Sequence, residues 1–440
     1  MATSNRRFGL AFVLFAAVGA VGGWIYARQA KDDAPKEGDP SASGDSPRRS
    51  KTGKQAPHDC SIRVTQGELE KSIDLGTKYM VAHQKSFGNF DYEYDWKKKT
   101  YSTDDSSPRQ AGALWGLSLL HAYHGAKSPP ELQQAVKRGI KYFDDRSRTT
   151  STGWRYPVYK GDGDQTDGDK GGMGMAALVT LGIIDYVRTL PPGEERTKLT
   201  ARANEYISFI AGSIKNDGLW PGDYRYENGD GTGAHSPYSD GEALLCLVVA
   251  MKYLGRDDLR PVIQKAAAEG HRVNVDEALA KARDSATTKG YYQWSSMAYY
   301  ELATSAMGAA PAEYGSWLMS LADWIIDVHN VGDKARNTGY AYEGIVSAYA
   351  WAKASKDPRE EKYFCAIHRG LAGLMGWQVG HPRAAALGAT DDPKAIGGVQ
   401  NHATEPPLRI DVVQHQMHGT MLAIEHVFGA GGDATAPAAK

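Results

Sequence analysis

The chain has 440 residues, a formal net charge of −1 and 41% hydrophobic residues, and one residue in ten is aromatic. A balanced charge without a basic stripe argues against a nucleic-acid-binding protein. Three cysteines are too few for a disulfide-dense scaffold or a cysteine-rich zinc ribbon. The Tyr and Trp content instead suits a neutral or mildly charged ligand that stacks on aromatic rings.

The N-terminal residues predict a membrane anchor. Residues 8–26 form an uncharged apolar run, which as a helix would span about 28 Å, close to the ~30 Å hydrocarbon core of a bilayer. Arg6 and Arg7 precede the run and favour a cytoplasmic stub at 1–7 with export of the rest. A removable signal peptide is the alternative. Because no small-residue cleavage pattern follows the run, we expect a membrane-anchored, extracytoplasmic protein, periplasmic or at the cell surface.

Two further segments have little that could be buried. Residues 27–60 are rich in Lys, Asp, Ser, Pro and Gly, which predicts a disordered linker. Residues 430–440 are expected to form a flexible tail. The folded domain is therefore predicted to span 61–429.

A repeated unit organises this domain. In the first unit an amphipathic helix begins near Thr65, with Leu69, Ile73 and Met80 on one face. A crossing rich in aromatic and acidic residues follows, and then residues 111–120, which are apolar on nearly every side. A helix with one apolar stripe lies at a surface, whereas a helix that is apolar all round is enclosed by protein. The unit therefore predicts an outer helix that leads into an inner one.

The pattern returns five more times. The expected outer and inner helices are 130–145 with 173–187, 194–214 with 241–253, 261–283 with 295–307, 312–329 with 342–354, and 358–377 with 412–427. Aromatic- and glycine-rich crossings separate them, the fourth being 290–294, and Gly270 could divide the fourth outer helix in two. Six such pairs closing on themselves predict an all-α (α/α)6 toroid of six helical hairpins, with an open helical array as the alternative.

This alternation, the six-fold count and the Gly-aromatic crossings resemble the six-hairpin toroids of glycosidases, polysaccharide lyases and glucuronyl C5-epimerases. The stretch 73–84 followed by Gly88-Asn-Phe90 is also similar to the helix–Q-x-G-W repeat of terpene cyclases and prenyltransferases. The resemblance spans roughly 65–429 and is architectural, since no catalytic motif of any one family is matched. It implies a fold and leaves the activity to be argued from the site.

In such a ring the starts of the inner helices would converge on a central cavity. Asp240 and Glu242 flank Gly241, so one of them is expected to reach the cavity while the other caps the helix. Glu343 occupies the equivalent place two repeats later. One protonated and one ionised carboxylate are the minimal set for glycoside hydrolysis. For each residue, a capping or core role is the alternative.

A second polar group lies at the start of the sixth inner helix. Asp411 and His415 are one helical turn apart and can share a face, with Arg409 and His418 nearby. An oriented histidine could act as acid or base while Arg409 binds a sugar carboxylate, which suits a uronate lyase or epimerase. An aspartate cap with a core histidine is the alternative. The predicted catalytic set is Asp240, Glu242, Glu343, Asp411 and His415.

Aromatic side chains in and near the crossings suit stacking on sugar rings, although packing of the crossings would use the same residues. The predicted substrate-binding set is Arg109, Gln110, Trp154, Tyr156, Trp220, Tyr224, Gln293, Trp294, Tyr342 and Arg409.

We predict no metal and no cofactor. Residues 161–169 hold four acids that could suit calcium, but their spacing does not fit an EF-hand, which favours a solvated acidic turn. Cys246 falls within an inner helix and should be a buried thiol. Ring closure would place the first outer helix beside the sixth, so we hypothesise a Cys60–Cys365 disulfide.

Together these features predict a carbohydrate-active enzyme acting on a polysaccharide or oligosaccharide. A glycoside hydrolase is placed ahead of a uronate lyase or epimerase, because carboxylates outnumber other credible bases. The alternatives are a non-catalytic glycan- or peptide-binding toroid and a terpenoid cyclase-like barrel.

Overall fold

The computed structural model describes residues 60–160, 168–305 and 311–429. The predicted stub, membrane anchor and tail, nearly all of the linker and most of the acidic turn lie outside these ranges. Among the described helices, none combines the length and the apolar character that a membrane crossing requires.

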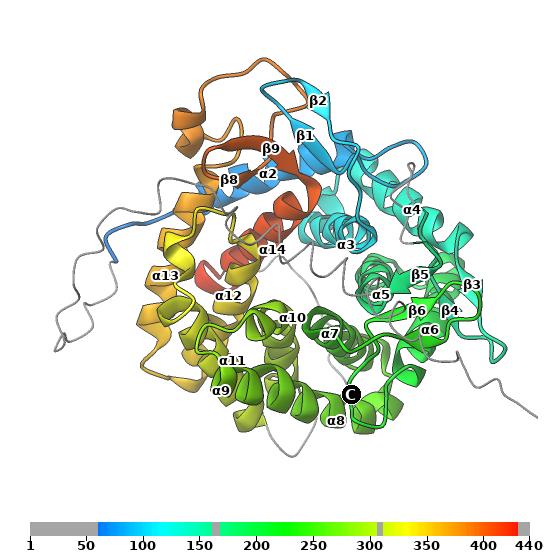
Figure 1. The fold of residues 1–440 in the computed structure, drawn as a ribbon. Helices are drawn as coiled ribbons and strands as arrows, with labels where there is room; N and C mark the ends of the chain where they lie inside the picture. The colour runs from blue at the N-terminus through cyan, green and yellow to red at the C-terminus, as the bar shows by residue number, and fades with distance from the viewer. Residues whose placement is uncertain (1–59, 161–167, 306–310, 430–440) are drawn as a thin grey trace, which may run out of the picture. The chain divides into compact units, whose positions relative to one another are not determined.

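Within the described residues, helices alternate between an inner and an outer position (Figure 1). The inner helices are α3 (Ser107–His124), α5 (Met173–Thr189), α7 (Pro237–Leu254), α10 (Ala286–Ala303), α12 (Gly339–Ser355) and α14 (Ile410–Val427). Each packs against the next along the chain, and α14 packs against α3. The inner helices therefore form a closed ring, not an open array.

The outer helices cover this ring. They are α2 (Gln66–Ala82), α4 (Pro130–Asp145), α6 (Glu194–Gly212), α8 (Arg260–His271), α11 (Pro311–Asp327) and α13 (Glu360–Met375). After α8 the chain continues as a π-helical segment, η4 (Arg272–Glu277), and the short α9 (Ala278–Lys281). Short 3-10 turns occupy Gly125–Lys127, Asp257–Leu259, Val331–Asp333 and Pro382–Leu387. The arrangement confirms the predicted toroid of helical hairpins.

The sequence accounts for this division into two layers. In α4 the apolar side chains of Leu132, Val136, Ile140 and Phe143 share one buried face, as expected of an outer helix. In α5 every residue from 173 to 187 is buried, which requires protein on all sides. The outer helices therefore face water on one side and the inner helices do not.

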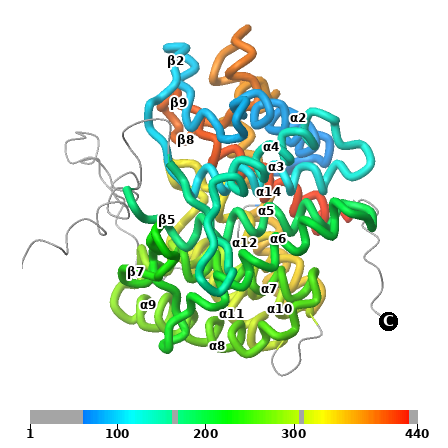
Figure 2. Tube along the Cα trace, turned by 90° about the vertical axis from the view of Figure 1, so that its right-hand side faces the viewer, coloured from blue at the N-terminus to red at the C-terminus, as the bar shows by residue number. Residues whose placement is uncertain are grey.

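Short antiparallel strands in the crossings join neighbouring repeats. The largest sheet has the order β2-β1-β9-β8, with β1 (Glu93–Asp95), β2 (Thr100–Tyr101), β8 (Gln400–His402) and β9 (Glu405–Arg409). A second has the order β5-β6-β7, with β5 (Lys170–Gly172), β6 (Asp223–Arg225) and β7 (Gly231–Thr232), and β3 (Arg148–Thr149) pairs with β4 (Arg155–Tyr156). Figure 2 places β2, β5, β7, β8 and β9 on one side of the helices. Because β1 pairs with β9, the first crossing is joined to the last.

One predicted crossing is wrong. Residues 290–294 lie inside α10, which begins at Ala286 after Ser285 accepts a hydrogen bond from the Thr288 amide. Position 290 of this helix requires glycine, because a Cβ there would lie 2.8 Å from the Tyr238 ring of α7. The close approach of two inner helices, and not a turn, explains this glycine. Gln293 and Trp294 are therefore inner-helix residues.

The Cys60–Cys365 disulfide is confirmed, with a Cα–Cα distance of 4.8 Å. It joins the segment before α2 to α13, which are far apart in sequence but adjacent at the closure of the ring. Cys246 is a buried free thiol in α7, as expected.

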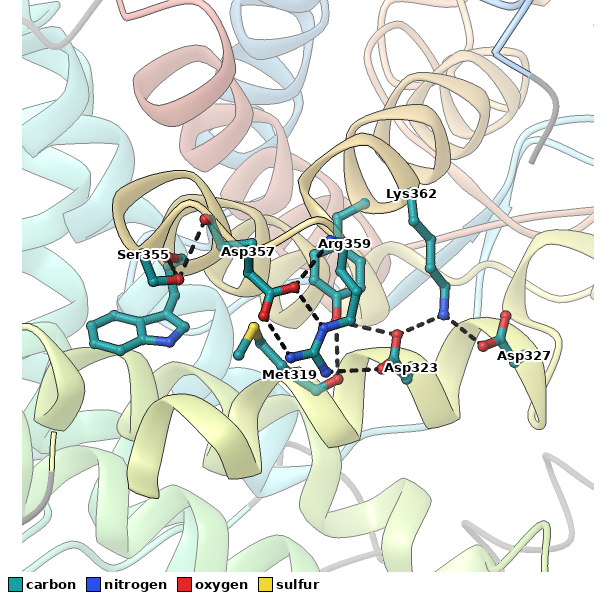
Figure 3. Close-up of polar contacts among 10 residues, drawn as sticks. Met319, Asp323, Asp327, Ser355, Asp357, Arg359 and Lys362 are labelled. Atoms are coloured by element: carbon teal, nitrogen blue, oxygen red, sulfur yellow. Dashed lines mark hydrogen bonds and ion pairs between the residues drawn. The ribbon is translucent and has the colours of Figure 1, made fainter. Parts of the chain in front are cut away.

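Charged side chains also connect neighbouring outer helices, as Figure 3 shows for α11 and the start of α13. Asp323 accepts hydrogen bonds from Arg359 at 3.2 Å and from Lys362 at 2.6 Å. Lys362 also reaches Asp327, and Asp357 holds Arg359 through both carboxylate oxygens. This network lies in the outer layer, on residues that form no part of the candidate site described below.

Candidate active site

Glu343, in the second turn of α12, is the centre of a polar cluster in the inner ring. Its Oε2 accepts a hydrogen bond from Gln293 Nε2 of α10 at 2.5 Å. Its Oε1 lies 3.2 Å from His415 Nδ1 and 3.3 Å from His418 Nδ1, both of α14. One carboxylate therefore contacts side chains from the two inner helices that flank α12.

The electrostatics of the cluster keep Glu343 ionised. Burial alone would raise the pKa of this carboxyl, but His415 and then His418 hold the pKa below its ordinary value. Gln293 Nε2 lies 3.1 Å from His415 Nδ1 but donates over the shorter distance of 2.5 Å to Glu343. Because the Glu343 carboxylate only accepts hydrogen bonds, we assign a proton to Nδ1 of His415. This assignment leaves Nε2 of His415 as the basic nitrogen.

Two tryptophans pack against the histidines. The ring centroids of Trp294 and His415 are 6.0 Å apart, and those of Trp115 and His418 are 5.0 Å apart. The Trp115 indole donates a hydrogen bond to Asp185, which fixes its orientation. The indoles provide apolar walls beside a charged cluster.

Exposure differs within the cluster. The Glu343 side chain is 0% exposed, that of His418 is 9% exposed and that of His415 is 20% exposed. A ligand could therefore reach His415, whereas Glu343 is covered by its partners. The carboxylate can orient a histidine but cannot itself touch a substrate in this arrangement.

Glu242 lies apart from this cluster, in α7 against Gly174 of α5. Burial raises the pKa of its carboxyl to about 8. Within the described residues it has no hydrogen-bond or ion-pair partner that would stabilise a negative charge. Glu242 is therefore a protonated carboxylic acid at neutral pH, in contrast to the ionised Glu343.

Asp411 binds two arginines at the start of α14. Its carboxylate accepts hydrogen bonds from Arg409 at 2.6 and 3.1 Å and lies 3.2 Å from Arg109 Nε of α3. Burial opposes ionisation of Asp411, but Arg409 and Arg109 hold its pKa well below the usual range. The Tyr92 ring lies beside both guanidinium groups, 5.3 and 5.7 Å from them, and the Tyr92 hydroxyl accepts a hydrogen bond from Arg109. The group lies one turn from His415 along α14.

Comparison with known proteins bears on this architecture. No protein-family model matches the sequence, and no curated protein matches it either. The structure is similar to an α-mannanase of glycoside hydrolase family 76 from Bacteroides thetaiotaomicron, with 9% identity, a TM-score of 0.55 and coverage of 82% of this chain and 96% of that one. It is similar to a D-mannose isomerase, with 11% identity, a TM-score of 0.58 and coverage of 84% and 99%. A cellobiose 2-epimerase from Bacillus thermoamylovorans has 12% identity, a TM-score of 0.57 and coverage of 82% and 98%.

The chain has the (α/α)6 toroid fold. At these identities the likeness extends to the fold alone, so the site has to be judged from its own residues.

The toroid places two predicted polar residues in anchoring positions. Asp240 accepts hydrogen bonds from the Trp220 amide at 3.0 Å and from Asn274 of η4 at 3.1 Å, and it lies 2.9 Å from His235. These contacts hold the third crossing against the outer layer, so Asp240 does not share a group with Glu343. Gln110 exchanges two hydrogen bonds with the Phe90 backbone and clamps the first crossing.

The predicted stacking residues of the toroid are used mostly for packing. Tyr156, Trp220 and Tyr224 are at most 1% exposed, and each donates a hydrogen bond to a backbone carbonyl. The Trp154 ring packs over Gly212 of α6, and the Tyr342 ring packs over Gly370 of α13. Tyr156, Trp220, Tyr224 and Tyr342 are buried and offer no open face to a sugar, whereas Trp154 is half-buried. Of the predicted aromatic set, Trp294 alone packs against the Glu343 cluster.

Sequence reasoning left two members of the cluster out of the predicted site. His418 was noted beside Asp411 and His415 but was not included in the predicted catalytic set, although its spacing of three residues from His415 puts both on one helix face. Trp115 lies in a stretch that is apolar on nearly every side, so nothing in the sequence distinguishes it from the core.

Proposed function

We propose that this protein is a carbohydrate-active enzyme in which His415, oriented by the Glu343 carboxylate, transfers a proton to or from a sugar. The observation that carries the proposal is the contrast between a fully covered Glu343 and a partly exposed His415 in direct contact with it. Histidine changes charge near neutral pH, and a positioned acid–base group contributes about 10²–10⁴-fold to a rate.

This geometry favours proton transfer at a sugar carbon, as in a lyase or an epimerase, over hydrolysis by paired carboxylates. In hydrolysis the second carboxylate must reach the anomeric carbon or a water beside it. Glu343 is covered by Gln293 and the two histidines and does not meet that requirement. The fold is compatible with sugar chemistry, since the α-mannanase, the D-mannose isomerase and the cellobiose 2-epimerase share it.

A hydrolase is the second candidate, and Glu242 favours it. A carboxylic acid that stays protonated at neutral pH can donate a proton to a glycosidic oxygen. The ionised partner would then have to be a group other than Glu343, and Asp411 is already held by two arginines.

The proposal includes an extracytoplasmic location with an N-terminal membrane anchor. The apolar run at 8–26, which follows Arg6 and Arg7, supports an anchor with the rest of the chain exported. The Cys60–Cys365 disulfide supports export as well, because such bonds persist in oxidising compartments. Protection of the domain from protease added to spheroplasts, in which only the cytoplasmic membrane remains closed, would contradict this location.

The activity can be tested by incubating the full-length protein with neutral and uronate oligosaccharides. New reducing ends report hydrolysis, absorbance of unsaturated products reports elimination, and solvent-deuterium uptake reports proton exchange at carbon. We expect His415→Ala to abolish the signal and Arg359→Gln, in the outer network of Figure 3, to retain it. Unchanged turnover in His415→Ala would contradict the proposed role of His415. If no saccharide is turned over, the proposed enzyme is wrong and a glycan-binding protein becomes the better interpretation.

A further inference from the structure

Trp115 and Trp294 meet across the interior of the ring. Trp115 lies in α3 and Trp294 in α10, two inner helices on opposite sides of the ring. Their ring centroids are 5.8 Å apart, within the range of roughly 4.5–7 Å that is typical of favourable aromatic pairs. Both side chains are buried, and each lies near the middle of its helix. The two indoles therefore close the interior of the ring partway along its axis.

Each indole of this pair contacts one histidine of the Glu343 cluster. The His418 ring packs edge-on against Trp115, and the His415 ring packs against Trp294. Glu343 Oε1 in turn lies 3.3 Å from His418 Nδ1. The position of Trp115 therefore bears on His418 and, through it, on the carboxylate that orients His415.

Asp185, near the C-terminal end of α5, holds Trp115 in place. Its Oδ2 accepts a hydrogen bond from Trp115 Nε1 at 2.8 Å, and its Oδ1 accepts one from Arg188 Nη1, also at 2.8 Å. The Asp185 side chain is only 6% exposed, so both bonds are shielded from water. The Arg188 guanidinium lies 3.6 Å from the centroid of the Tyr253 ring of α7, which fixes it against a second inner helix. Asp185 thus links the indole to the end of the ring that lies away from the crossings.

The sequence around Asp185 suggests that this link has a purpose beyond packing. Asp185 is the one charged residue in the buried stretch 173–187 of α5. Moving a carboxylate out of water costs free energy, which its hydrogen bonds at best offset. Phenylalanine at position 115 with leucine at position 185 would fill the same space without that cost. What the Trp115–Asp185 pair adds is a fixed direction for the indole, because its N–H must point at the carboxylate.

We propose that Asp185 is a positioning residue of the site, which acts through Trp115 to fix His418 and the Glu343 carboxylate. The inference rests on the proposed function and adds a residue to its site. Without the hydrogen bond the indole can turn away from Trp294, and His418 loses the ring against which it packs. Glu343 then holds His415 less firmly, and a displacement of about 1 Å in a reacting group can cost about 10²-fold in rate.

Steady-state kinetics of the full-length protein, on the saccharide that the wild type turns over, provides the first test. We expect Asp185→Leu to lower kcat about tenfold and to leave KM within about twofold, because no group that contacts the substrate is removed. Asp185→Asn keeps an acceptor for the indole and should retain most of the wild-type kcat. Asp323→Leu, in the outer network of Figure 3, is the matched control. It should lower the melting temperature and leave kcat unchanged.

A double-mutant cycle tests whether Asp185 acts through the indole. Trp115→Phe removes the donor, so Asp185 has nothing left to orient in that variant. Adding Asp185→Leu to Trp115→Phe should therefore lower kcat by less than about twofold. Losses in kcat that multiply in full would overturn the inference.

The histidine rings report the positioning without any turnover. Nuclear magnetic resonance of the full-length protein with isotope-labelled histidine gives their signals, and His415→Ala and His418→Ala assign the two of interest. We expect both signals to shift in Asp185→Leu and to stay in place in Asp185→Asn and Asp323→Leu. A His418 signal that stays in place in Asp185→Leu would overturn the inference, as would a wild-type kcat.

The two measurements separate this inference from the proposed function. Shifted histidine signals without turnover of any saccharide would support the positioning role and contradict the proposed enzyme. Turnover that depends on His415 but not on Asp185 would do the reverse. Should Asp185→Leu fail to fold, Trp115→Phe leaves no buried donor unpaired, and a wild-type kcat or an unmoved His415 signal there would overturn the inference.

Discussion

The Glu343 carboxylate lies 3.2 Å from Nδ1 of His415, although 72 residues separate them in the sequence. The contact depends on the closed ring, which sets α12 beside α14 so that their second turns meet. Because Gln293 and His418 fill the remaining space around the carboxylate, His415 is left as the reachable member. The ring thus converts residues from separate repeats into one acid–base unit.

We expect Glu343→Gln to reduce kcat by about tenfold or more while leaving KM nearly unchanged. The amide keeps the shape of the side chain but removes the carboxylate that accepts a hydrogen bond from Nδ1 and so orients the imidazole. An unchanged kcat in Glu343→Gln would contradict the orienting role.

Glu242 should make the protein less stable as the pH rises. Its pKa is raised from 4.5 to about 8, so between these values the folded state holds a proton that the unfolded state has released. Stability therefore falls from about pH 4.5 to about pH 8, by up to roughly 4 kcal/mol. Glu242→Gln cannot ionise and should gain thermal stability relative to wild type between pH 5 and pH 8. The exposed Glu227→Gln is the matched control, and an equal gain there would refute this origin.

Reduction of the Cys60–Cys365 bond should destabilise the folded domain. The bond closes a loop with a sequence separation of 305, and loss of a native disulfide typically costs about 2–5 kcal/mol. The melting temperature of wild type should fall in reductant, and Cys60→Ser should melt at the lower temperature with or without reductant. Cys246→Ala should keep the sensitivity of wild type; if it lost that sensitivity, the bond would not be its source.

The packing role of Tyr342 is open to a direct test. A Cβ at Gly370 would lie 1.8 Å from Cζ of the Tyr342 ring, so Gly370→Ala should destabilise the protein by about 1–3 kcal/mol. Gly373 lies in the same helix with nothing within 4 Å of the corresponding position, and Gly373→Ala should be neutral or stabilising. Thermal melts of the two variants provide the comparison. Tyr342→Phe should leave KM within about twofold, and a large rise in KM would restore a binding role.

Periodicity along the chain was enough to predict the layers and their order. The predicted bounds of α4 coincide with those observed, because Pro130 marks its start and its apolar stripe is regular. The fourth repeat was misassigned because Gly290 with two tyrosines looks like a turn, while the reason for the glycine is a neighbouring helix that sequence does not display.

The candidate site was predictable only in part. The starts of the inner helices identified Glu343 and His415, which meet at one end of the ring. Gln293 was singled out from a predicted crossing that is in fact part of α10. They could not separate Asp240, which faces the outer layer, from Glu242, which lies between inner helices. That difference depends on how each helix is rotated about its axis. For the same reason, buried rings such as Trp220 and Tyr224 could not be distinguished from exposed ones.

The covalent link at Cys60 has a mechanical consequence. Tension applied to the chain upstream of Cys60 passes through sulfur to α13 before it reaches α2. Such a force therefore does not pull α2 away from the ring directly. The disulfide must be broken before a force on the N-terminal side can separate the first repeat from the last.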